Sequence, residues 1–105
     1  MNIAFHYLYR DGANYKNLNT VIFDNPNDIT LETLSQLLKD KLISEEYFYA
    51  NEWKIPDMHF GSWDNEIDHE FHQFETIEYT DEIANSEITL VDFIEIVKNT
   101  NWDNH

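Results

Sequence analysis

The chain has 105 residues with 21 acidic and 6 basic side chains, which give it a formal net charge of −15. Hydrophobic residues make up 42% of it and aromatic residues 15%, so we expect one folded domain over residues 1–105 and not a disordered acidic tail. The absence of cysteine excludes disulfides and thiolate metal sites, and the shortage of Lys and Arg argues against direct binding of nucleic acid.

The N-terminal residues predict a β-hairpin. Residues 3–9, IAFHYLY, are apolar on both sides of a two-residue alternation, which is typical of a central strand. Residues 11–14, DGAN, favour a turn, and residues 20–23, TVIF, form a second β-rich run. We expect the two runs to pair as antiparallel strands across a longish loop.

A helix is predicted over residues 31–42. Thr30 precedes it as an N-cap, and Glu32 in its first turn complements the helix dipole. Lys39 and Lys41 lie near the expected C-terminus. One apolar stripe at helical spacing consists of Leu31, Leu34, Leu37, Leu38 and Leu42.

The middle of the chain permits more than one structure. Residues 47–53, YFYANEW, fit either a strand or a short helix after Ser44. Between residues 64 and 74 the apolar spacing is helical, whereas the run FETIEYT over residues 74–80 is rich in β-formers. We predict a loop or a short helical turn to residue 71 and then a strand over about 73–80.

The C-terminal part predicts a helix over residues 90–98. Thr89 is its N-cap, and Asp92 three residues later resembles the second half of a capping box. Residues 99–105 are expected to fray unless Trp102 packs back on the domain. These elements predict an α+β fold with a small antiparallel sheet of three to five strands and two helices on one face.

Acidic and aromatic residues intermix from residue 44 onward and predict a protein-binding surface. Residues 44–105 contain sixteen acidic side chains and only Lys54 and Lys98 as bases. Exposed Trp and Tyr side chains favour protein contacts, and dense carboxylates imitate the charge of DNA. The expected function is a non-enzymatic inhibitor or nucleic-acid mimic that blocks a nuclease, toxin, defence effector or DNA-binding protein. Its predicted contact residues are Trp53, Trp63, Asp64, Glu66, Asp68, Glu70, Glu75, Glu78 and Tyr79.

Two alternatives accompany this hypothesis. The aromatic residues can simply form the core while the acids form a solvated surface, although solubility needs a net charge of only roughly 2–8. The second alternative is a metal-binding or metal-dependent protein, because His69 and His72 are three residues apart and share a face on a helix. The candidate ligands are His59, Asp68, His69 and His72, and on a strand positions 69 and 72 would face opposite ways.

The remaining sequence signals concern catalysis and location. Carboxylate pairs are abundant, but the chain has no GxSxG motif, P-loop, Gly-rich phosphate loop or cysteine nucleophile. We therefore expect no enzymatic activity and no cofactor. The first ten residues lack the features of a signal peptide, and no apolar run has the roughly 18–20 residues of a membrane span. A cytoplasmic location is the resulting expectation.

Overall fold

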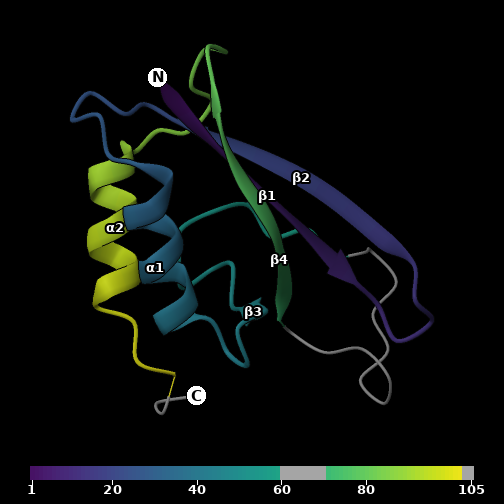
Figure 1. Cartoon of the computed structure of the whole chain (residues 1–105). Helices are drawn as coiled ribbons and strands as arrows, with labels where there is room; N and C mark the ends of the chain where they lie inside the picture. The colour runs from purple at the N-terminus through teal and green to yellow at the C-terminus, as the bar shows by residue number, and fades with distance from the viewer. Residues whose placement is uncertain (60–70, 103–105) are drawn as a thin grey trace.

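A computed structural model describes residues 1–59 and 71–102 and shows a four-stranded antiparallel sheet with two helices on one face (Figure 1). The strand order is β2-β1-β4-β3. This arrangement confirms the predicted α+β fold. The elements are β1 (Asn2–Arg10), β2 (Lys16–Phe23), α1 (Leu31–Lys41), β3 (Tyr47–Phe48), β4 (His72–Thr80) and α2 (Leu90–Lys98).

The predicted hairpin is confirmed, but its second strand is longer than expected. β2 begins at Lys16 and pairs with β1 from Arg10↔Lys16 to Ile3↔Phe23. The Asp11 carboxylate accepts hydrogen bonds from the backbone N–H groups of Ala13 and Tyr15, at 3.0 and 2.9 Å. This closes the turn within five residues, and the polar half of β2 that follows carries no hydrophobic pattern that would have indicated a strand.

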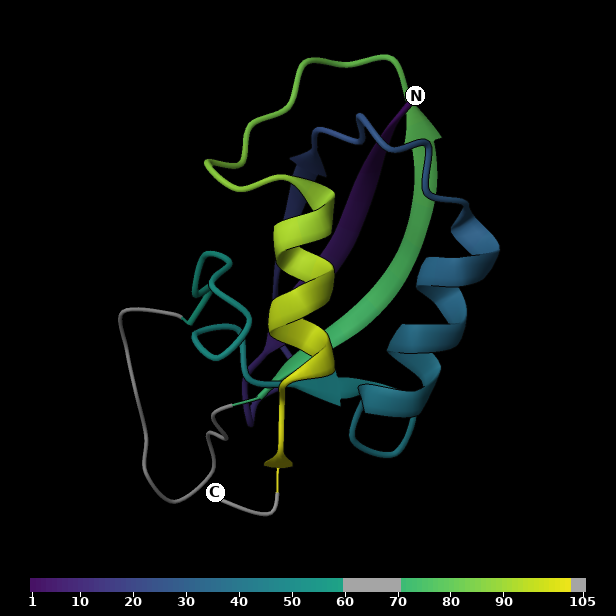
Figure 2. The ribbon, with the colours of Figure 1, turned by 90° about the vertical axis from the view of Figure 1, so that its left-hand side faces the viewer.

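Both helices begin where the sequence predicts. Thr30 Oγ1 accepts a hydrogen bond from Thr33 N, and Thr89 forms a complete capping box with Asp92. These caps satisfy backbone donors that a helix leaves unpaired in its first turn. Both helices pack on the same face of the sheet (Figure 2), and their buried residues are Leu34, Leu38, Leu90, Phe93, Ile94 and Val97.

The central strand β1 contributes most of the sheet's share of the core. Ile3, Phe5 and Tyr7 alternate along one face and are fully buried. β4 pairs with the other side of β1, and the register shifts between His6 and Tyr7. Because β1 is paired on both sides and covered by the helices, it is the most enclosed element of the fold.

The segment after α1 contains only the two-residue strand β3, followed by turns through Trp53. The Trp53 side chain is 0% exposed and stacks on Phe48 with ring centroids 4.7 Å apart. Its indole Nε1 donates to Thr100 Oγ1 at 2.9 Å. The prediction that Trp53 anchors a partner is therefore wrong: burial of its large apolar ring makes it a core residue.

Trp102 packs back on the domain, so the expected fraying does not extend to residues 99–102. Its indole Nε1 donates to the backbone carbonyl of Lys41 at the end of α1. Its ring centroid lies 5.7 Å from that of Trp53 and 5.6 Å from that of Tyr49. Residues 103–105 lie outside the described structure. Within the described ranges, no helix has the length and apolar character that a membrane crossing requires.

Replacing Trp53 by Ala is expected to lower the free energy of unfolding by about 3–5 kcal/mol, because it leaves a cavity among buried rings. Urea unfolding followed by circular dichroism would measure the change. Ile83 is 89% exposed, and Ile83→Ala is the control, for which we expect a change below about 0.5 kcal/mol. A small effect of Trp53→Ala would contradict the core assignment.

Candidate functional site

The predicted partner-binding residues fall into three groups. Trp53 lies in the core, as described above. Glu75, Glu78 and Tyr79 lie on β4 and are exposed. The others lie outside the described residues, so their placement remains a prediction; they are Trp63, Asp64, Glu66, Asp68 and Glu70.

β4 directs its exposed side chains to different sides. Glu78 pairs with Ala4 across the strands, and its carboxylate lies 3.0 Å from His6 Nε2 on the face of the sheet opposite the helices. Tyr79 is 45% exposed, and its hydroxyl accepts a hydrogen bond from Leu31 N at the start of α1. Glu75 lies at the register shift and lines a groove between α1 and β4.

The outer edge of β4 over residues 75–80 is here called the acidic strand edge. β3 pairs only with Gln73 and His72, and Phe74 N donates to Glu46 O. Beyond this point, no strand within residues 1–59 or 71–102 pairs with the outer side of β4. Such an edge can accept another strand, and charged side chains such as Glu75 and Glu78 oppose pairing between two copies of this chain.

The carboxylates of the second half of the chain face solvent. Every described acidic side chain between residues 44 and 102 is exposed. No lysine or arginine occurs in the sequence between Lys54 and Lys98. The acids concerned are Glu45, Glu46, Glu52, Asp57, Glu75, Glu78, Asp81, Glu82, Glu87, Asp92 and Glu95.

A second constellation brings together Asp57, His59 and His72. One ligand atom of each lies within 4.8 Å of the others. Asp57 Oδ1 is 2.7 Å from His59 Nδ1 and 3.4 Å from His72 Nε2. Asp57 is exposed, His59 is half-buried, and His72 is 1% exposed at the start of β4. Imidazole and carboxylate groups are the donors that divalent transition metals prefer.

The structure thus joins only some of the residues in the predicted metal site. His59 and His72 lie together, whereas Asp68 and His69 lie outside the described residues. Asp57 was not among the predicted ligands. Its signal in the sequence is its position two residues before His59, because side chains at i and i+2 of an extended segment share a side.

Hydrogen bonds from the sheet fix the segment that carries Asp57 and His59. Tyr7 Oη donates to Pro56 O at 2.5 Å, and Asn17 Nδ2 donates to Met58 O at 3.0 Å. Met58 N donates to His72 Nε2 at 2.9 Å. Burial raises the pKa of the Tyr7 hydroxyl above 10.0, with a smaller raising effect from the Asp57 charge, and the hydrogen bond from Asn19 opposes both.

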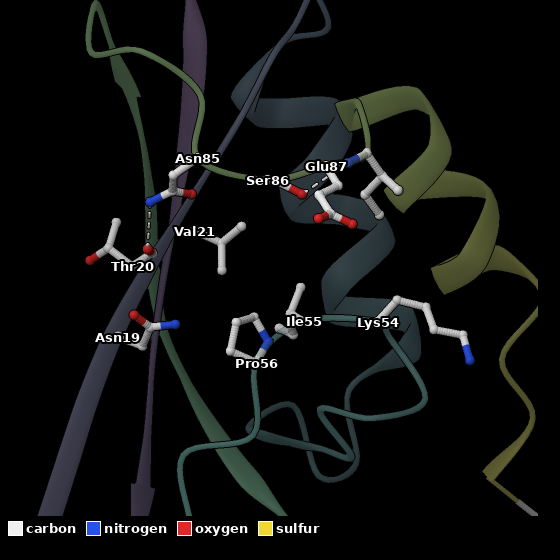
Figure 3. A pocket seen from close by; sticks show the side chains of 10 residues that line it. Asn19, Thr20, Val21, Lys54, Ile55, Pro56, Asn85, Ser86 and Glu87 are labelled. Carbon is white, nitrogen blue, oxygen red and sulfur yellow. Dashed lines mark hydrogen bonds between the residues drawn. The ribbon is translucent and has the colours of Figure 1, made fainter.

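A separate pocket lies between β2 and two loop segments, 54–56 and 85–88 (Figure 3). Asn85 holds one of these loops on the edge of β2, because its side chain bonds Ile22 N at 2.8 Å and Thr20 O at 3.3 Å. The titratable side chains of the lining are Lys54 and Glu87. The Lys54 amine points away from the other labelled side chains (Figure 3), so Lys54 and Glu87 do not form an acid–base pair in this pocket.

Replacing Tyr7 by Phe tests how the segment at residues 56–59 is held. The raised pKa means that folding favours the protonated hydroxyl, so this stabilisation is present below pH 10.0 and is lost as pH rises through the folded-state pKa. We expect Tyr7→Phe to be about 1–2 kcal/mol less stable at pH 7 and to lose less stability above pH 10. Urea unfolding between pH 7 and 11 would measure both.

The control for this comparison is Tyr15→Phe, because the Tyr15 side chain is 69% exposed. It should leave the stability at pH 7 and its alkaline decline unchanged. Parallel declines of the wild type and Tyr7→Phe above pH 10 would contradict the assigned role of the Tyr7 hydroxyl.

Comparison with known proteins identifies no relative. No protein-family model matches the chain, and neither a curated protein nor a solved structure matches it significantly.

Proposed function

We propose that this protein is a non-enzymatic acidic inhibitor that binds the basic groove of a nucleic-acid-handling protein. The observation that carries this proposal is that every described acidic side chain between residues 44 and 102 is exposed, in a chain with a net charge of −15. Duplex DNA carries one negative charge per about 1.7 Å, so a basic groove that binds DNA attracts such a surface too. A nuclease, a toxin, a defence effector or a DNA-binding protein fits this description.

The charge is costly for the protein itself, which argues that it serves a purpose beyond solubility. Like charges repel in the folded state and lower its stability. Colloidal solubility requires a net charge of only roughly 2–8 in a domain of this size. Complementary charge accelerates association with a basic partner and rejects acidic ones. Recognition of a basic protein would therefore explain a charge that solubility does not require.

We propose the acidic strand edge as one part of the contact surface. Glu75 supplies charge at this edge, and Glu78 supplies it on the adjoining sheet face, where its carboxylate contacts His6. Tyr79 supplies an aromatic side chain of the kind that is frequent at protein interfaces. No described strand pairs with the outer side of β4 here, so its backbone could form hydrogen bonds with an extended segment of a partner. Trp63, Asp64, Glu66, Asp68 and Glu70 remain predicted contacts on sequence grounds.

The decisive experiment is a pull-down from host lysate with tagged wild type and two charge-reversal variants. We expect a basic partner to bind at low salt and to elute at high salt, because added ions screen exposed charges. Glu75→Lys/Glu78→Lys should weaken binding of that partner by about tenfold, a loss of about 1.4 kcal/mol. Asp64→Lys/Glu66→Lys/Asp68→Lys/Glu70→Lys should abolish it. Calorimetry with the purified partner would measure the affinities.

A matched control separates a specific surface from net charge. Glu87→Lys/Glu95→Lys reverses two exposed acids, one in the loop before α2 and one on α2, and neither lines the groove beside the acidic strand edge. If the edge is the contact, this control should bind more tightly than Glu75→Lys/Glu78→Lys. Binding by the quadruple variant at moderate salt with the wild-type affinity would refute the proposed function.

A further inference from the structure

We propose that Asp57, His59 and His72 form a binding site for one divalent transition metal ion of the Zn²⁺ class. Their ligand atoms already lie within 4.8 Å of one another. Metal–ligand bonds of about 2.0–2.2 Å place neighbouring tetrahedral ligands about 3.4 Å apart, so modest side-chain rotation completes the site. This proposal does not depend on the proposed inhibitor function, because none of the three ligands is a predicted partner contact and the ligand they bind is a metal ion.

The backbone around these ligands is fixed before any ion binds. Tyr7 Oη on β1 and Asn17 Nδ2 on the neighbouring strand β2 hold the carbonyl groups of Pro56 and Met58. His59 N donates to Asp57 Oδ1 at 2.8 Å, which orients the carboxylate toward the histidine. A ligand set supported in this way loses little conformational freedom when it binds a metal.

The orientation of His72 favours a cation beside Asp57. Because Met58 N–H donates to His72 Nε2, this nitrogen carries a lone pair and no proton. Nε2 lies 3.4 Å from Asp57 Oδ1, which is the spacing of two neighbouring ligands around one tetrahedral metal ion. When a metal ion binds, the Met58 N–H hydrogen bond is exchanged for a bond between Nε2 and the metal.

Aromatic rings enclose the imidazole of His72. Its ring centroid lies 5.9 Å from that of Tyr7, 5.3 Å from that of Tyr9 and 6.0 Å from that of Phe48. Because the residue is 1% exposed, these rings hold the imidazole in place beside Met58 and Asp57. The acidic protein as a whole also raises the local concentration of cations.

The donor set determines the class of metal. Two imidazole nitrogens and one carboxylate suit Zn²⁺, and the same combination is used for Fe²⁺ and related ions. Mg²⁺ and Ca²⁺ prefer oxygen ligands and are poor matches for two histidines. Three protein ligands also leave at least one coordination position open for water or another small ligand.

The experiment is calorimetric titration of the chelator-treated full chain with ZnCl₂ in excess Mg²⁺, which suppresses binding to carboxylates alone. We expect one Zn²⁺ per chain, and affinity losses of more than about tenfold for Asp57→Asn and for His59→Ala. His6→Ala is the matched control, because His6 also contacts a carboxylate, that of Glu78, outside the three-ligand cluster. It should bind Zn²⁺ with the wild-type affinity.

Two further measurements keep the result interpretable. In an NMR titration with Zn²⁺ the Met58 amide signal should shift, because the ion takes the lone pair of His72 Nε2 that accepts the Met58 N–H hydrogen bond. Co²⁺ should give a visible absorption spectrum in the wild type that Asp57→Asn and His59→Ala lack. Equal Zn²⁺ affinities of wild type and both variants, or no binding in excess Mg²⁺, would overturn the proposal. Both variants replace residues with solvent access, so they should leave the fold intact, which circular dichroism would check.

Discussion

Tyr7 connects the core of this protein with its candidate metal site. Its ring lies on the buried face of β1, and its centroid is 5.7 Å from that of Phe5 and 5.6 Å from that of Phe48. Its hydroxyl donates a hydrogen bond to the carbonyl of Pro56, which directly precedes the segment with the proposed ligands Asp57 and His59. The position of these ligands therefore depends on the packing of the most enclosed strand of the sheet.

Two demands on the fold oppose each other. The aromatic core, centred on Phe5, Phe48, Trp53 and Phe93, must stabilise a domain whose surface carries a large excess of one charge. Self-repulsion of that charge lowers stability, while burial of aromatic rings raises it. Trp53 and Trp102 contribute to this core although both occur in acidic stretches of the chain. Aromatic residues that looked available for a partner are thus partly required for stability.

The two proposals concern different regions and are compatible. The acidic strand edge lies along β4 next to α1, whereas the cluster of Asp57, His59 and His72 lies at the beginning of β4 and in the segment that the sheet holds in place. A bound divalent ion would neutralise part of the local charge and fix the start of β4. The inhibitor function would still depend on exposed carboxylates elsewhere.

The sequence by itself determined the elements that local chemistry specifies. Thr30 and Thr89 marked the helix starts, and period-two and helical apolar patterns located β1, β4 and both helices to within two residues or fewer at each end. The polar half of β2 escaped prediction because Asn17 and Asn19 are used for tertiary hydrogen bonds and carry no hydrophobic pattern.

Only the tertiary structure decided which aromatic residues are buried and which polar residues meet. The acidic residues around Trp53 in the sequence do not reveal that its ring is buried. That burial depends on partners distant in the sequence, such as Phe93 and Thr100. Likewise, Asp57 and His72 are separated by fifteen positions in the sequence. They come together only because β4 pairs with β1 and because Tyr7 on β1 holds the neighbouring Pro56 by a hydrogen bond. Contacts between distant residues follow from the chain's topology, which no local pattern encodes.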